Sequence, residues 1–511
     1  EASDFPKRWL DFAASVVEKL KKVASGAAGS AVSLDSEEFP IRGRVSKEEI
    51  LEVVARIDLR YNYLSIINCL EDEPEDKKNV LARCIQGAEA SLAVVEKSFK
   101  ESDEARDALG FVQYLNKSHM PAIPPRTIDK VSGSQVVTYF RNFLEDARLV
   151  AASVKCKDVL SLKRHLGEFS DRNPEAIMRS LQALLCKRMN LKDLVCASLG
   201  VSTKGLEQDR EFASCLADCT GILEMYNNAA CRNKCQQHRK CKKVLRELNL
   251  KLLQREGSLS SAMASKLNLN APSAGGGAGA LLVKWIELLG HSIALKQLLV
   301  GFDLELYETS DFLMIYWYCE RLLSGYIDKF QEARDLAQQG VKGSPSKGKK
   351  KGSKGKKEGG FLDENGVMGR LFVLESTRLV LSGIVRMLAA LKKQGIIQPA
   401  SSIFNTEEHR YVQRFSHFLD LHTPLPLGYG EYVYATTVDE MSVTELCESA
   451  KKSFENSLRV TSHLKATLPA ESKKNEKELH DLERISKRNM VGLALVVMGR
   501  FNLEHLTRIL V

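Results

Sequence analysis

The sequence predicts an all-α protein, an irregular multi-helix scaffold with a disordered lysine-rich loop. Only 7% of its 511 residues are aromatic, and Leu, Ala, Glu and Lys are common, which favours helices over sandwiches or barrels. Apolar residues recur at helical spacing, and no fixed-period repeat is present. A composition of 44% hydrophobic and 27% charged residues excludes a disordered, collagen-like or membrane-embedded chain. At this length we expect about three or four packed units.

Residues 1–120 are expected to form a first helical region. Apolar positions at helical spacing fill 5–23 and 80–99. Between these helices, Ser46 and Glu49 match a capping box, in which each side chain bonds the other residue's backbone N–H at the start of a helix. This region therefore predicts three helices of about twenty residues each.

Residues 121–272 are expected to form a middle helical region. The prolines at 121–125 predict an extended strap, because proline restricts its own backbone and that of the preceding residue. A helix near Ser134 and further helices follow, of which 229–256 is the longest expected. The glycine-rich run 274–279 is then expected to separate two halves of the chain.

Two more helical regions are expected at 280–340 and 361–511, with helices at 281–300, 311–336 and 367–393. The last of these helices carries a single apolar stripe, which predicts packing against another helix of the same chain. Two further long helices are expected from Val438 and from Ser472. The closing residues 503–511 fit either a short strand or a helical turn.

Between these regions, 341–360 is expected to be a disordered tether, because Gly and Ser separate its charges and it lacks large apolar residues. Its eight lysines account for most of the net charge of +9. The tether fits two interpretations equally: docking on a polyanion or a solvated linker. The candidate polyanion contacts are Lys342, Lys347, Lys349, Lys350, Lys351, Lys354, Lys356 and Lys357.

A cluster of cysteines with one histidine partly matches the spacing of zinc ligands. Its members are Cys215, Cys219, Cys231, Cys235, His238 and Cys241. The cysteine pairs are four residues apart in helical sequence, and no Gly or Pro turn of the kind found in zinc knuckles lies between the members of either pair. They fit core residues better than ligands, and we expect no metal site.

Catalytic signatures are also missing from the sequence shown. There is no G-x-S-x-G elbow, the ten histidines are dispersed, and a near-match to a phosphate loop at Gly343 has Lys350 where Mg²⁺ needs Ser or Thr. We therefore expect neither an enzyme nor a bound cofactor. Scattered cysteines without a signal peptide, and no apolar run long enough to span a bilayer, predict a cytoplasmic chain with no membrane contact.

Two aromatic segments are the strongest candidates for a functional surface. The first comprises Gly301, Phe302, Leu304, Glu305, Leu306, Tyr307, Tyr316, Trp317 and Tyr318. Three consecutive aromatic residues on a helix point about 100° apart, so at most two can face one core and the third must face another partner. A helix buried on several sides within this chain and a protein–protein contact both fit this pattern.

The second segment alternates cationic and aromatic side chains at Glu407, Arg410, Tyr411, Arg414 and Phe415. The acidic residues after Asn405 fit the first turn of a helix. Cation–π support within the chain and contact with an acidic surface remain open alternatives.

These segments, taken in order, resemble a known family. GFDLELY, IYWY, a lysine-rich tether, E-x2-R-Y-x2-R-F-x2-F and T-P-x-P occur in the same order in the large auxiliary subunit of the NatC N-terminal acetyltransferase. An upstream element from Gly110-Phe111 to Tyr139-Phe140 is similar to the same family. The resemblance runs from about Gly110 to the end. The family's N-terminal segment is not matched and the chain opens with Glu1, so we expect the natural N-terminus to be missing.

The resemblance implies a helical, non-catalytic subunit that scaffolds a GNAT-fold catalytic subunit and a small Sm-like subunit. The assembled enzyme would acetylate nascent chains that begin with Met and a bulky apolar residue, with acetyl-CoA on the catalytic partner and the lysine tether on ribosomal RNA. The residues agree, because the [QR]-x2-G-x-[GA] loop of GNAT enzymes fails at Phe169 and Leu259. The alternatives are a stand-alone helical adaptor that binds RNA or protein through the basic loop, and a zinc-dependent helical enzyme.

Overall fold

The structure is a computed structural model in which the chain forms two compact units. Unit 1 comprises Glu1–Cys156, Ser161–Arg172 and Met178–Met189, and unit 2 comprises the remaining residues. The residues that the structure describes are 5–26, 31–34, 43–71, 80–101, 132–154, 156, 162, 165–168, 191–199, 210–230, 232–266, 276–342, 364–398, 405–438, 440–467 and 476–502. The finer sequence division into five regions stays a prediction.

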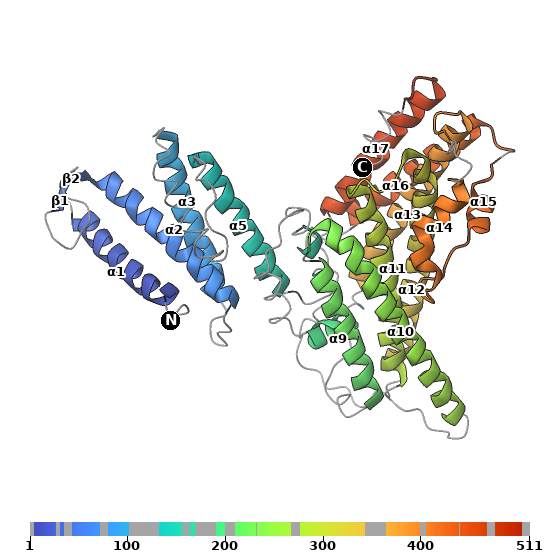
Figure 1. Ribbon diagram of the computed structural model, residues 1–511, viewed down its shortest axis with the longest axis horizontal. Helices are drawn as coiled ribbons and strands as arrows, with labels where there is room; N and C mark the ends of the chain where they lie inside the picture. Colours follow the sequence, from blue (N-terminus) through green and yellow to red (C-terminus); the bar gives the residue numbers. More distant parts are fainter. Residues whose placement is uncertain are drawn as a thin grey trace. The chain divides into compact units, whose positions relative to one another are not determined.

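Unit 1 is a series of helices, each packed on the next along the chain (Figure 1). Its helices are α1 (Phe5–Gly26), α2 (Lys47–Glu71), α3 (Val80–Glu101) and α5 (Gly133–Val154). The three helices expected before the prolines and the one near Ser134 are confirmed. A short antiparallel hairpin of β1 (Ala31–Leu34) and β2 (Gly43–Ser46) precedes α2 and was not expected from the sequence. The predicted proline strap lies outside the described residues.

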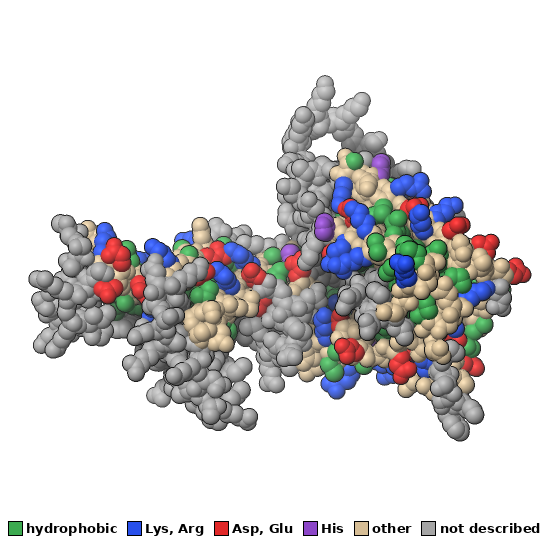
Figure 2. Space-filling view, turned by 90° about the horizontal axis from the view of Figure 1, so that it is seen from above, with side chains coloured by type: hydrophobic (Ala, Val, Ile, Leu, Met, Phe, Trp, Pro, Cys, Tyr) green, Lys and Arg blue, Asp and Glu red, His purple; other side chains and the backbone are tan. Residues whose placement is uncertain are grey.

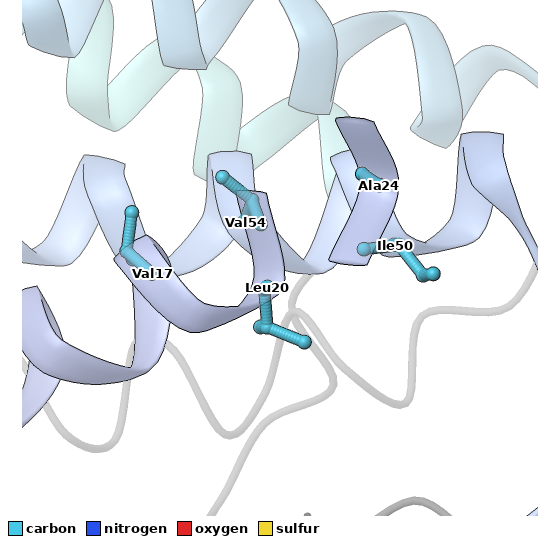
Figure 3. Packing of buried hydrophobic residues seen from close by; sticks show 5 residues of the cluster. All are labelled: Val17, Leu20, Ala24, Ile50 and Val54. Atoms are coloured by element: carbon cyan, nitrogen blue, oxygen red, sulfur yellow. The ribbon is translucent and has the colours of Figure 1, made fainter. Parts of the chain in front are cut away.

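The contact between α1 and α2 is an apolar seam. Val17, Leu20 and Ala24 of α1, spaced three and four residues apart, are buried against Ile50 and Val54 of α2 (Figure 3). Burial of each such Val, Leu or Ile side chain contributes roughly 1.5–3 kcal/mol. The 3–4 spacing therefore fixes the face that each helix buries.

Unit 2 contains the remaining described helices, of very different lengths (Figure 1). Many of them pack on their neighbours in the chain, but the most extensive contact joins α13 and α16, which are not consecutive. They are α8 (Leu191–Leu199), α9 (Arg210–Ala230), α10 (Lys234–Lys266), α11 (Gly276–Asp303), the 3-10 turn η1 (Thr309–Asp311), α12 (Phe312–Lys342), α13 (Glu364–Lys393), α14 (Glu407–Leu419), α15 (Tyr429–Thr436), α16 (Val443–Thr467) and α17 (Glu476–Val497). The predicted all-α class is confirmed, and lengths from 8 to 33 residues explain why the sequence shows no fixed period.

Two sequence expectations about helix boundaries are wrong. The helix expected at 229–256 is interrupted, because α9 ends at Ala230 and the side chain of Asn233 accepts a hydrogen bond from the Gln236 N–H, 2.9 Å, at the start of α10. The glycine run 274–279 does not separate two halves of the chain either, because it lies within unit 2 and Gly276, Gly277 and Gly279 begin α11. The expected tether from 343 onward and the closing residues 503–511 lie outside the described residues.

The predicted packing of the 367–393 helix on another helix of the chain is confirmed. Helix α13 contacts α12, α16 and α17, and its seam with α16 is built from small residues. The Ser376 and Ser457 hydroxyl groups lie 2.7 Å apart, both buried. A Cβ atom placed on Gly383 would lie 2.7 Å from the ring of Phe454, which is fully buried.

We therefore expect Gly383→Ala to destabilise the protein by about 1–3 kcal/mol, because the added methyl group overpacks the seam. Gly221→Ala is the matched control, since Gly221 lies in α9 with no atom within 4 Å of the added Cβ. This control gains helix propensity of up to about 1 kcal/mol. Urea unfolding of both variants measures the difference, and equal stabilities would contradict the packing.

Candidate functional site

The sequence GFDLELY forms the end of α11 and reverses the chain. The Leu306 N–H donates to the Gly301 carbonyl oxygen and the Glu305 N–H to that of Phe302, both at 3.0 Å. Glu305 has a φ of 52°, so the segment is a Schellman cap with a non-glycine residue in the left-handed position. The first role of the motif is therefore to end helix α11, and any contact with a partner would be secondary to that role.

Tyr307 folds back over this cap. Its hydroxyl group donates to the Leu298 carbonyl oxygen, 3.1 Å, and a Cβ atom on Gly301 would overlap that hydroxyl group. The Phe302 ring packs edge-on against Tyr307, with centroids 4.9 Å apart. Burial raises the pKa of Tyr307, so the phenol stays protonated and keeps its donor role. Leu304 is half-buried, and Leu306 is exposed.

The three consecutive aromatic residues of α12 are all buried within this chain. Tyr316 contacts Phe302 of α11, with centroids 4.9 Å apart. Trp317 contacts Tyr432 of α15, 5.5 Å. Tyr318 stacks on Phe415 of α14, 4.1 Å with an interplanar angle of 13°. Of the two alternatives, the helix buried on several sides within this chain is confirmed, because the three aromatic residues contact α11, α15 and α14 in turn.

Asp311 connects these helices electrostatically. This carboxylate is fully buried at the end of η1. Arg410 Nη1 lies 2.8 Å from its Oδ1, and Arg414 donates to Oδ2 from Nη2 at 2.9 Å and from Nε at 3.1 Å. The Glu308 N–H also donates to Oδ2, 3.2 Å. Several charge-assisted hydrogen bonds offset the desolvation of a buried charge.

Helix α14 also contacts α13, α15 and the segment before α15. Thr406, not Asn405, is its N-cap, and the Thr406 side chain accepts from the His409 N–H. Glu407 accepts from Lys392 of α13 at 2.7 Å and from the Tyr432 hydroxyl group of α15 at 2.9 Å. The Tyr411 hydroxyl group donates to the Leu427 carbonyl oxygen, 2.9 Å.

The two sequence segments therefore meet in one place, which we call the aromatic junction: residues 301–318 with 406–418 and α15. The guanidinium group of Arg414 lies over the Tyr307 ring, 5.7 Å from its centroid, so cation–π contact within the chain is observed. Packing, ion pairing and cation–π contact account for these residues without a catalytic role for any of them. The junction positions four helices of unit 2.

A half-open groove of about 640 Å³ lies beside the aromatic junction, between α12, α13, α15 and α16. Trp317 forms part of its wall, and Tyr434 stands at 88% exposure on α15. Glu320 and Arg386 add charge to the lining, and burial raises the pKa of Glu320. This groove could not be predicted from the sequence, because its walls come from four separate helices.

The cysteine cluster does not assemble into a metal site within the described residues, where no group of three or more His, Cys, Asp or Glu side chains is placed to hold an ion. Cys215 and Cys219 are buried on α9, while Cys235 is exposed and Cys241 is buried on α10. Cys231 lies outside the described residues.

Helix α10 carries a basic face that was not predicted from the sequence. Arg239, Lys240, Lys242, Lys243 and Arg246 have no acidic side chain at ion-pair distance within the described part of the chain. Burial and the neighbouring cations lower the pKa values of Lys240 and Lys242. Figure 2 shows Lys and Arg side chains prominent on the visible surface of unit 2. The signal for this face in the sequence is the pattern RKCKKVLR, residues 239–246.

The tether lysines are mostly outside the described residues. Lys342 is the last residue of α12, so the first two residues of the expected tether, 341 and 342, are helical. Lys347, Lys349, Lys350, Lys351, Lys354, Lys356 and Lys357 are not described. None of the described helices has the length and hydropathy to cross a membrane.

The helices of unit 2 pack around a buried aromatic junction. This arrangement defines the class of the protein as a helical scaffold. The chain belongs to the NAA35-like family of TPR-repeat proteins, whose profile matches residues 149–507.

Named relatives cover different parts of the chain. N-alpha-acetyltransferase 35, NatC auxiliary subunit, of Homo sapiens is 22% identical over 420 residues, which is 76% of this chain and 56% of that protein. The homolog from Drosophila melanogaster is 26% identical over 217 residues, 40% of this chain and 26% of that protein. The chain thus spans about a quarter to just over half the length of these relatives.

Solved structures share the fold. A chain in the NatC complex bound to Gag peptide and CoA aligns with a TM-score of 0.61 at 14% identity, over 95% of this chain and 69% of that one. A chain in the complex bound to Arl3 peptide and CoA gives 0.60 at the same identity. At this identity the likeness establishes the helical architecture alone.

We expect Asp311→Asn to destabilise the protein by about 3–5 kcal/mol, because Arg410 and Arg414 lose their shared counter-charge in a buried site. Glu455→Gln is the matched control, since its ion pair with Lys451 is exposed and 3.8 Å long, and exposed pairs contribute about 1 kcal/mol or less. Denaturant unfolding compares the two variants. A change below 1 kcal/mol for Asp311→Asn would show that the ion pairs do not hold the junction.

His417 of α14 makes stability pH-dependent. Its Nε2 accepts from the Gln297 side-chain amide, 2.7 Å. Burial, with Lys242, His238 and Arg246 nearby, lowers its pKa to about 3, against about 6.5 when unfolded. Its contribution is complete above pH 6.5 and is lost as the pH falls toward 3, because the unfolded chain binds the proton first.

His417→Gln, which keeps an acceptor for Gln297, should therefore lose less stability than the unsubstituted protein between pH 6.5 and 4. Thermal melts across that range measure the slope. His409→Gln is the control at an exposed position and should leave the slope unchanged. If both variants gave the same slope, His417 would not be the source of the pH dependence of stability.

Proposed function

We propose that this chain is a non-catalytic auxiliary subunit of a NatC N-terminal acetyltransferase and organises a GNAT-fold catalytic subunit and a small Sm-like subunit. The family match over 149–507 is the observation that carries this proposal. The residues of the aromatic junction support it, because their contacts are accounted for by helix packing and ion pairing. The same match favours an auxiliary subunit over a stand-alone adaptor.

The assembled enzyme would act in the cytoplasm on nascent chains that begin with Met followed by a bulky apolar residue. Acetyl-CoA would bind to the catalytic partner, not to this chain. The half-open groove and the exposed Leu306 leave surface for partners beside a rigid junction.

Affinity purification of the tagged chain from cells should recover a GNAT-fold acetyltransferase and a small Sm-like protein in stoichiometric amounts by mass spectrometry. The purified complex should acetylate a Met-Leu peptide, whereas the isolated chain should not. Robust acetyl transfer by the isolated, contaminant-free chain, or its recovery without any acetyltransferase, would refute the proposal.

Ribosome docking is proposed through the lysines of 342–357, acting on RNA phosphates without sequence preference. The basic face of α10 supports this idea, because it offers further cations in the same unit. Each phosphate contact adds about 0.7–0.9 to the logarithmic salt dependence of binding.

Deletion of 342–357 should weaken co-sedimentation with ribosomes and flatten its salt dependence. Charge reversal at Lys240 and Lys243 tests the α10 face separately. If the deletion leaves both the amount bound and the salt slope unchanged, the tether has no part in docking.

A further inference from the structure

Helix α17 buries one stripe of side chains and leaves a second stripe exposed. Its main contacts are to α16 and α13. The buried positions recur at alternating spacings of three and four residues, which is the pattern of a helix packed along another helix. They form the inner stripe: Leu479, Leu482, Ser486, Asn489, Leu493 and Val496. The same alternating spacing occurs in a second set, the outer stripe: Arg484, Lys487, Val491, Ala494 and Met498.

The outer stripe lies on the opposite side of α17 from its packed face, because an offset of five residues turns a helix by about 140°. All of its side chains are exposed, Val491 at 64% and Met498 at 56%. The Met498 N–H donates to the Ala494 carbonyl oxygen, 3.0 Å, so helical hydrogen bonding continues to the end of the stripe, and Gly499 with a φ of 66° then ends it. The outer stripe therefore has the geometry of a helix–helix seam without its second helix.

The outer stripe is cationic at one end and apolar at the other. The sequence from 484 to 502 contains Lys and Arg but no Asp or Glu. Arg484 and Lys487 pair with acidic residues of their own helix in exposed contacts, which are weak in water. Arg488, beside the stripe, has no acidic side chain at ion-pair distance in the part of the chain that is described. A covering helix therefore needs acidic residues opposite this end and apolar residues opposite the rest.

The charge pattern argues against a second copy of this chain as the cover. Parallel pairing of two outer stripes would place Arg484 and Lys487 against the same cations of the other copy, and antiparallel pairing would place them against Met498 and Ala494. A lipid surface also fits poorly. Helices that lie on membranes carry Trp, Phe or Leu on the apolar face and cations along the polar face, whereas here the cations share one stripe with Val, Ala and Met.

We propose that the outer stripe of α17 is a docking site for a helix of a different protein, one that is acidic at one end and apolar at the other. This helix packs along α17 in the manner of a coiled coil, with its acidic end at Arg484, Lys487 and Arg488. The inner stripe holds α17 on α16 and α13, so the site is presented on a packed support. Ala494, at the apolar centre, lets the partner backbone approach closely.

Fluorescence anisotropy tests the site with the full chain and two labelled helical peptides of about three heptads. Both peptides carry leucine at successive seam positions, and the seam positions at one end are glutamate in one peptide and lysine in the other. The glutamate peptide should bind roughly 10-fold more tightly or better, because the lysine peptide sets like charges together. Arg484→Glu combined with Lys487→Glu should reverse this preference. The test needs no acetyltransferase, so its failure and that of the proposed function are separate results.

Val491→Asp should abolish binding of the glutamate peptide and keep the melting temperature, because the side chain is exposed. Val94→Asp is the matched control, at an exposed position of α3, and should leave binding unchanged.

A photo-crosslinking benzoylphenylalanine in place of Val491, in the chain purified from cells, should join a segment of another protein with the acidic and apolar pattern. The proposal is overturned if the two peptides bind equally or not at all, or if Val491→Asp leaves binding unchanged. It is also overturned if the cross-links form only with residues of the same chain, with a second copy or with lipid.

Discussion

One buried carboxylate, Asp311, sets the geometry of the aromatic junction. Its oxygens are occupied by two guanidinium groups from α14 and by a backbone N–H from the start of its own turn. Because an uncompensated charge is unstable at a site without solvent, α14 must lie where its arginines can reach η1. The stacking of Tyr318 on Phe415 then follows from that placement and adds dispersion to it.

The rest of unit 2 is built on a different principle. Where α13 meets α16, serine and glycine replace large apolar residues, so the helix backbones approach closely and Phe454 fills the remaining space. Close backbone contact limits how far the helices can slide past each other. A rigid helical stack of this kind suits a subunit whose proposed role is to hold other subunits in position.

The sequence predicted helix positions well wherever one face of a helix meets a core. The helices at 5–23, 80–99 and 367–393 follow from apolar spacing, which reports local burial directly. The start of α10 was not predicted because the side-chain cap of Asn233 has no periodic signature. Helix α15 was missed because eight residues are too few to show a period.

Partners across the chain were harder to predict than helices. Spacing showed that Arg410 and Arg414 share a face, but it carried no information that this face meets Asp311, about 100 residues earlier. The same limit explains the three aromatic residues of α12: their directions were foreseen, while the helices that surround them were not. The basic face of α10 could have been predicted, because its five cations lie within eight consecutive residues of the sequence, 239–246.

Asp311 and Arg414 are 103 residues apart in the chain, and this separation has a consequence during synthesis of the protein. At about 5–20 residues per second, synthesis leaves Tyr316, Trp317 and Tyr318 without their α14 and α15 neighbours for roughly 5–20 seconds after they are made. During its own translation the chain thus exposes the apolar surface of these three aromatic residues. A chaperone or an early-binding subunit would shield that surface.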